Sequence, residues 1–177
     1  MNAAIFSALG TLVVRYVQHK GQEFSEYDAL RNEERARARE VFDAVSTATD
    51  SRLYAMERVY YSVVDKEHYT NKDRLTRWEE YRDVLWDWNS KITRTEALIS
   101  TYFGQEFLGR FMAVMQGFES TGLHKVRNNP ESHKDYPVLE NLTALRAELK
   151  ALYVEMLERI QSGNVGQVAK IDRPGFL

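Results

Sequence analysis

The chain of 177 residues contains no cysteine, only 3 prolines and 9 glycines. Without cysteine, disulfide bonds, thiolate metal ligands and cysteine nucleophiles are all excluded. The scarcity of proline and glycine argues against a β-rich fold, which would need more turn residues. The net charge of -2 gives no attraction to phosphate groups, so nucleic-acid binding is not expected. Hydrophobic residues at 44% and charged residues at 28% are instead typical of one folded domain with appendages.

The sequence also lacks the motifs of the common enzyme classes. It has no glycine-rich phosphate loop, no Gly-x-Ser-x-Gly elbow and no His-Glu-x-x-His helix. Di-iron bundles need Glu-x-x-His pairs, and no such pair occurs either. The histidines fall near the apolar N-terminus or in predicted loops, at His19, His68, His124 and His133. We therefore expect no catalytic residue, no cofactor and no metal ion.

One partial motif points to a metal-dependent enzyme. Glu79, Glu80 and Asp83 form a Glu-Glu-x-x-Asp sequence. It resembles the first half of the motif in helical pyrophosphohydrolases of the MazG type, whose carboxylates hold magnesium against the phosphates of a nucleotide. The second half, a Glu-x-x-Asp downstream, is missing, because the other Glu-x-x-Asp of the chain, Glu40 to Asp43, comes earlier. The incomplete motif disfavours this enzyme hypothesis.

An apolar segment opens the chain, because no charged side chain occurs from residue 1 to residue 14. Its bulky side chains are the candidate membrane contacts, namely Ile5, Phe6, Leu9, Leu12, Val13 and Val14. A helix needs about 20 apolar residues to cross a bilayer, so this segment is short unless Arg15 extends its side chain to the interface. We interpret residues 1–20 as a membrane anchor. The alternative is an apolar helix that packs in the bundle or against a partner.

The positive charges of this region, Arg15 and Lys20, flank the apolar run on its C-terminal side. A secretory signal needs positive charge before the apolar run and a small-residue cleavage site after it, so cleavage is not expected. By the positive-inside tendency, the same charges place the rest of the chain on the cytoplasmic side. The sequence thus predicts a membrane-associated protein with a cytoplasmic bundle.

Apolar residues at alternating steps of three and four predict amphipathic helices at about residues 21–66, 73–103, 105–121 and 137–162. The second of these has the most regular apolar stripe, so we expect it at the centre of the fold. Thr70 and Asp73 form a capping box ahead of it, and Gly104 and Gly163 are placed to end helices. The sequence therefore predicts an all-α, antiparallel four-helix bundle.

The first predicted helix is longer than the others, so we expect a long protruding N-terminal helix. Its residues 31–40 carry charges of both signs, which is typical of an exposed stalk stabilised by i,i+4 ion pairs. Pro137 suits the first turn of the last helix. Residues 123–136 are expected to form the longest exposed loop, and residues 164–177 an irregular tail.

Four polar residues lie beside the apolar stripes of the first two helices. Arg82, Asn89 and Glu96 follow one another at intervals of seven, and Arg52 lies beside the stripe of the first helix. Polar residues in such places fix the register of a bundle or form an interface. They can also line a pocket for a small polar ligand.

Two aromatic residues, Tyr61 and Trp86, lie off the stripes and are candidate partner contacts. The leading hypothesis is a membrane-tethered structural or interaction protein without catalytic activity. It would act as an accessory subunit of a larger assembly, binding a protein partner or itself. The alternative is a ligand-sensing bundle that binds a small polar molecule at the polar residues beside the stripes.

Overall fold

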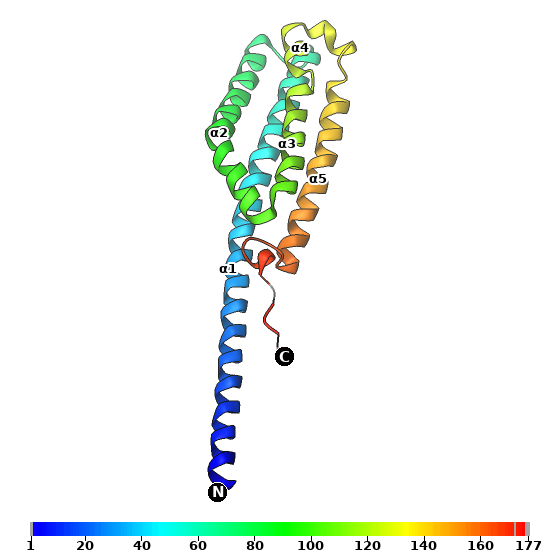
Figure 1. The fold of residues 1–177 in the computed structure, drawn as a ribbon. Helices are drawn as coiled ribbons and strands as arrows, with labels where there is room; N and C mark the ends of the chain where they lie inside the picture. Colours follow the sequence, from blue (N-terminus) through cyan, green and yellow to red (C-terminus); the bar gives the residue numbers. More distant parts are fainter. Residues whose placement is uncertain (1, 172, 176–177) are drawn as a thin grey trace.

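The computed structural model describes residues 2–171 and 173–175, with side chains from residue 12 onward. This part of the chain consists of helices and the segments that connect them. No strand occurs among these residues, so the predicted all-α class is confirmed. Figure 1 shows the elements, which are α1 (Asn2–Val64), α2 (Asn71–Phe103), α3 (Gln105–Ser120), α4 (Leu123–Asn128), α5 (Val138–Ser162) and the 3-10 turns η1 (Pro130–Lys134) and η2 (Val168–Lys170).

Four long helices form the predicted antiparallel bundle. Both α1 and α3 pack against α2 and α5, and successive long helices run in opposite directions (Figure 1). The expectation that the helix at 73–103 lies at the centre is wrong. It is α1 that also contacts α4, η1 and η2, whereas α2 packs mainly on α1 and α3.

The core is built from one apolar face of each long helix. Its largest fully buried side chains include Met56, Ile99, Phe107, Phe111, Phe118, Leu142, Leu149, Met156 and Ile160. Three of these are phenylalanines of α3, which explains how a helix of only 16 residues holds its place between two longer ones. Full burial of such a side chain contributes about 1.5–3 kcal/mol.

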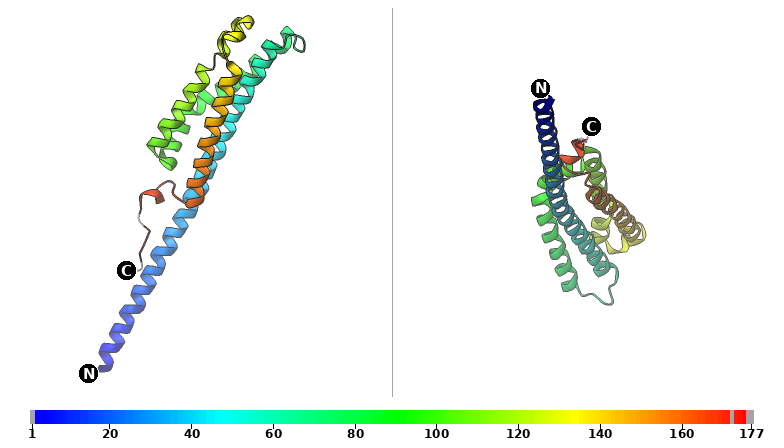
Figure 2. Two further views of the ribbon diagram at one scale, coloured as in Figure 1. Left: turned by 90° about the vertical axis from the view of Figure 1, so that its right-hand side faces the viewer. Right: turned by 90° about the horizontal axis from the view of Figure 1, so that it is seen from below.

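The N-terminal part of α1 projects beyond the bundle, as predicted (Figures 1 and 2). α1 has 63 residues, which corresponds to about 95 Å at 1.5 Å per residue. The predicted helix start near residue 21 is wrong, because α1 continues through Gly21. A single glycine inside a helix costs only about 1 kcal/mol and no proline is present to break it. The apolar segment and the bundle therefore share one helix.

The predicted caps at Thr70, Gly104 and Gly163 are confirmed. The Thr70 hydroxyl accepts a hydrogen bond from the N–H of Asp73 at 3.2 Å, and the Asp73 carboxylate accepts one from the N–H of Thr70 at 2.8 Å. Gly104 and Gly163 follow α2 and α5 with φ angles of 91° and 74°, which favour glycine. Pro137 precedes the first residue of α5 rather than lying within its first turn.

Residues 123–136 are not the long loop that the sequence predicts. They form α4 and η1, and Leu123 and Val126 are 3% and 0% exposed. The two side chains are three residues apart and therefore point to the same side of a helical turn, where they cover one end of the core. Burial of this short apolar pair outweighs the loop-forming composition around it.

The tail after α5 is packed rather than loose where the structure describes it. Val165 and Val168 are 0% and 5% exposed, and η2 lies against α1. The N–H of Gly166 donates to the carbonyl of Tyr102 at 3.1 Å, which joins the tail to the end of α2. Apart from the short turn η2, the described residues of the tail have no regular secondary structure, as expected.

Candidate functional site

The N-terminal part of α1 exposes apolar side chains far from the bundle. Leu12, Val13, Val14 and Val17 are 62%, 60%, 55% and 56% exposed. At 100° per residue they spread over more than half of the circumference of the helix. The remaining candidate anchor residues, Ile5, Phe6 and Leu9, lie outside the described side chains.

The flanking charges of this segment lie where the sequence places them. Arg15 is exposed, and Lys20 donates to the Glu23 carboxylate at 2.7 Å, one turn further along. His19 also approaches Glu23, at 3.2 Å. In the described part of the chain, no helix has both the length and the apolar character needed to cross a membrane.

The charged stretch at residues 31–40 is only in part the solvent-exposed stalk that its composition predicts. Arg37 pairs with Glu33 one turn earlier, as expected of such a stalk. Arg31 and Arg35, however, donate to the carbonyls of Ser162 and Ile160 at 2.6 and 2.9 Å. Both carbonyls lie in the last turn of α5, and that of Ile160 also accepts a hydrogen bond from the N–H of Gly163 at 3.1 Å. Two arginines of α1 therefore cap α5 and match the negative end of its dipole.

Glu34 takes part in the same junction. It is only 5% exposed, and its carboxylate accepts a hydrogen bond from the N–H of Gln167 at 3.4 Å. This contact fastens the tail to α1 across more than a hundred residues of sequence. Residues 31–40 therefore bind the end of α5 and the tail.

The four predicted polar residues do not form one ladder in the core. Arg52 is buried at 6% exposure, whereas Arg82 is exposed. Asn89 is exposed too but lines the same pocket as Arg52. Glu96 is half-buried and does not line this pocket. The structure thus brings Arg52 and Asn89 together and leaves the other two apart.

Arg52 is held by aromatic rings rather than by a carboxylate. Its guanidinium carbon lies 4.5 Å from the ring centre of Phe118 and 5.8 Å from that of Trp88. Burial raises the pKa of the Tyr81 hydroxyl above its ordinary value, and the positive charge of Arg52 nearby opposes that effect. Cation–π contacts of this kind are worth about 1–2 kcal/mol, whereas removing a charge from water costs several.

The pocket beside Arg52 has a volume of about 320 Å³. Apolar side chains form part of its wall, including Met56, Trp78, Leu85 and Leu123. Polar groups come from Asn89, Glu119, Thr121 and His124. The Thr121 hydroxyl donates its hydrogen bond to the carbonyl of Phe118 at 3.2 Å, so its proton is not available to a ligand.

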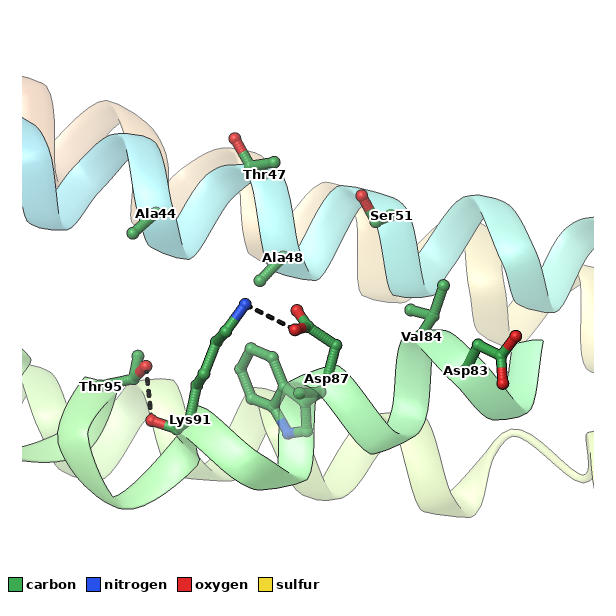
Figure 3. A pocket seen from close by; sticks show the side chains of 10 residues that line it. Ala44, Thr47, Ala48, Ser51, Asp83, Val84, Asp87, Lys91 and Thr95 are labelled. Atoms are coloured by element: carbon green, nitrogen blue, oxygen red, sulfur yellow. Dashed lines mark hydrogen bonds and ion pairs between the residues drawn. The ribbon is translucent and has the colours of Figure 1, made fainter. Parts of the chain in front are cut away.

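A second, larger hollow lies between α1 and α2 and has a volume of about 520 Å³ (Figure 3). Ala44 and Ala48 line it from α1, and Asp87 and Lys91 line it from α2. The Lys91 ammonium pairs with the Asp87 carboxylate at 2.5 Å, one turn earlier on the same helix. Its charge is thus matched within α2, as on an ordinary exposed helix, and we assign no ligand to this groove.

The candidate partner contacts are exposed. Trp86 on α2 is 72% exposed and Tyr61 on α1 is 44% exposed. Two further residues that the sequence analysis did not single out, Tyr54 and Leu75, are 61% and 65% exposed. Both lie one step off the buried stripe of their helix, and this offset is the signal that would have found them.

The carboxylates of the partial MazG-like motif do not converge. Glu80 pairs with Arg58 at 3.0 Å and with Arg77 at 3.2 Å, and Glu79 and Asp83 are exposed. Among the residues that the structure describes, no three His, Asp or Glu side chains lie close enough together to hold a metal ion. The arrangement therefore gives the magnesium hypothesis no support.

A polar cluster between α1 and α5 was not foreseen from the sequence. The hydroxyl of Tyr153 contacts that of Thr49 and donates to the Asp50 carboxylate at 2.9 Å. Burial and the bond to Asp50 raise the pKa of Tyr153 well above its ordinary value, against the bond to Thr49. The cluster ties two helices together through a neutral hydroxyl, so we assign it a structural role.

No protein-family model matches the chain, and no curated protein or solved structure matches it significantly. Its own residues therefore have to carry any functional assignment. Two features depart from an ordinary soluble bundle. They are the exposed apolar end of α1 and the buried charge of Arg52.

Proposed function

We propose that the protein is a membrane-tethered interaction protein whose apolar N-terminal segment enters a membrane and whose bundle binds a protein partner or a second copy of the chain. In this proposal the protein is an accessory subunit without a catalytic task. The bundle stands on the cytoplasmic side, because the positive charges follow the apolar segment.

The observation that carries this proposal is the exposure of Leu12, Val13, Val14 and Val17. About 24 residues separate Val14 from Ala38, the first fully buried apolar residue among the described side chains of α1, and this corresponds to about 36 Å along the helix. The bundle is too far away to cover these side chains. A helix that is apolar over so much of its circumference is stabilised by a membrane or by another protein.

Flotation with lipid vesicles tests the tether. We expect the full-length chain to float with vesicles that contain anionic lipids. Replacing Leu12, Val13, Val14 and Val17 by Gln should leave it at the bottom of the gradient. The matched control replaces three exposed polar residues of the same helix, Gln22, Ser25 and Asn32, by Ala.

The control variant should float like the wild type, because its apolar segment is unchanged. A folded wild-type chain that stays at the bottom with every vesicle composition would refute the membrane tether. The orientation is tested separately, by asking whether a protease added outside intact cells cuts the bundle. Cleavage of the bundle under these conditions would contradict the cytoplasmic placement.

The partner-binding part of the proposal rests on the exposed rings of Trp86 and Tyr61. Aromatic side chains are enriched in interfaces because they bury a large area at a small entropic cost. Sedimentation velocity with vesicle-free protein tests self-association. Trp86→Ala should lower the association constant at least fivefold, whereas Lys72→Ala, which changes an exposed residue of the same helix, should not.

A further inference from the structure

Arg52 carries a buried charge that has no carboxylate of a described residue within ion-pair distance. The side chain is 6% exposed, and its Nε has no hydrogen-bond partner. None of the ion pairs in the described part of the chain includes Arg52. Buried charges are ordinarily paired, and aromatic contacts compensate only part of the cost of desolvation. The position therefore favours an anion.

The pocket beside Arg52 restricts what that anion is. A volume of about 320 Å³ lies at the lower end of the range for small-molecule sites. The apolar wall of Trp78, Leu85 and Leu123 favours a ligand with an apolar body. Glu119 also lines the pocket, and its carboxylate would repel a doubly charged phosphate more strongly than a single negative charge.

We propose that this pocket binds a small monocarboxylate with an aromatic or branched aliphatic body. Arg52 takes the carboxylate through the edge formed by Nε and one terminal nitrogen, the arrangement in which a guanidinium holds a carboxylate with two parallel hydrogen bonds. The Asn89 amide, which lines the same pocket, is placed to donate to the ligand. This binding site is independent of the membrane tether.

Binding requires a small movement of Arg52. In this structure the Nε is closed to water, and the guanidinium lies near the rings of both Phe118 and Trp88. The side chain has to turn toward the pocket to meet a carboxylate. Its contact with the Trp88 ring then changes, so the fluorescence of that tryptophan reports binding.

The test is a fluorescence titration of the full-length chain with Trp86→Phe. This substitution removes the exposed tryptophan and leaves only Trp78 and Trp88, both near the site. The probes are phenylacetate, 4-methylpentanoate and inorganic phosphate. Phenylacetamide is the neutral counterpart of the first. We expect saturable binding of both carboxylates, with phenylacetamide and phosphate at least tenfold weaker.

The variant Arg52→Met keeps the volume of the side chain and removes its charge. We expect it to lower the affinity for phenylacetate by about ten- to a hundredfold, the range for losing charge-assisted hydrogen bonds. The matched control is Arg82→Met, an exposed arginine of α2 that does not line the pocket, and its affinity should equal that of the parent. Circular dichroism establishes that each variant is folded.

Three outcomes would overturn the proposal. The first is the absence of saturable binding of either carboxylate up to about 10 mM, and the second is equal binding of phenylacetamide and phenylacetate. The third is an Arg52→Met variant that binds phenylacetate as tightly as the parent. The first two outcomes are measured on the parent chain, so they decide the question even where Arg52→Met fails to fold.

Discussion

Gly166 is the position at which one added methyl group gives the most specific test of the fold. Its φ is +60°, a value that glycine adopts freely and other residues rarely. A Cβ at this position would lie 1.7 Å from Oε2 of Glu34, far inside contact distance. Gly166→Ala therefore forces either the tail or the Glu34 carboxylate to move.

The expected cost follows from these two contacts. A left-handed backbone costs a residue with a Cβ about 1–2 kcal/mol. Moving the Glu34 carboxylate breaks its hydrogen bond from Gln167, and a bond to a charged group is worth about 1.5–3 kcal/mol. Together the two contributions give an expected loss of about 2.5–5 kcal/mol. The loss cannot exceed the free energy of detaching the tail, because detachment removes the clash at the cost of exposing Val165 and Val168.

Urea unfolding and amide hydrogen exchange measure this loss. The N–H at position 166, which donates to Tyr102, should lose its protection first, ahead of the bundle. Combining Gly166→Ala with Glu34→Ala should recover part of the loss, because the clash is removed. The matched control is Gly109→Ala in α3, where a Cβ has no neighbour within 4 Å and the helix gains up to about 1 kcal/mol. Equal stability of the two alanine variants would refute the reasoning.

Three further changes test other parts of the bundle. Leu142→Ala, at 0% exposure, should lower the free energy of unfolding in urea by about 2–5 kcal/mol. Tyr153→Phe removes the hydroxyl that joins α5 to α1 and should cost about 1–2 kcal/mol in the same assay, provided the cluster is structural. The hydrogen bonds from Thr70 lower the pKa of Asp73 below its ordinary value of 3.8. The stability that ionised Asp73 gives to the start of α2 is therefore fully present above pH 3.8 and is lost as the pH falls through the lowered pKa. An NMR titration measures this loss, and Thr70→Ala should make it smaller.

The bundle could be predicted from the sequence because the signals that define it are local. Alternating steps of three and four describe which face of a helix is buried, and three of the four buried residues of α2, Tyr81, Trp88 and Ile99, follow such steps. Caps are more local still, since Thr70 and Asp73 need only each other. The four long helices, their order and most of their ends follow from such patterns.

The errors arose where a residue's partner is distant in the sequence. Arg31 and Arg35 belong to a charged stretch, and the charges next to them in the sequence predict an exposed stalk. Their hydrogen bonds run to carbonyls 131 and 125 residues away. No local pattern contains that information, and the same holds for Val165 and Val168 in the tail. The short helix α4 was not predicted because its two buried apolar residues are too few to define a helical periodicity.

Two of the four predicted polar residues belong to the candidate site, and the sequence did not show which two. Arg52 and Asn89 were singled out because they lie beside the apolar stripes, and the structure places both at one pocket. Spacing along a helix cannot tell Arg82 from Asn89, since both are at the same heptad position. Which of the two lines the pocket depends on what packs against α2, and that is set by α1 and α3.

The two proposals concern the two regions in which the distribution of side chains differs from that of an ordinary folded domain. Apolar side chains ordinarily gather in the core, yet Val13 and Val14 of α1 are more than half exposed. Charges ordinarily stay at the surface, yet Arg52 of the same helix is buried without a carboxylate. Each departure lowers the stability of the isolated chain, and such departures are expected at functional sites. Because α1 is one continuous helix, a tether at one end also fixes the direction in which the pocket is held.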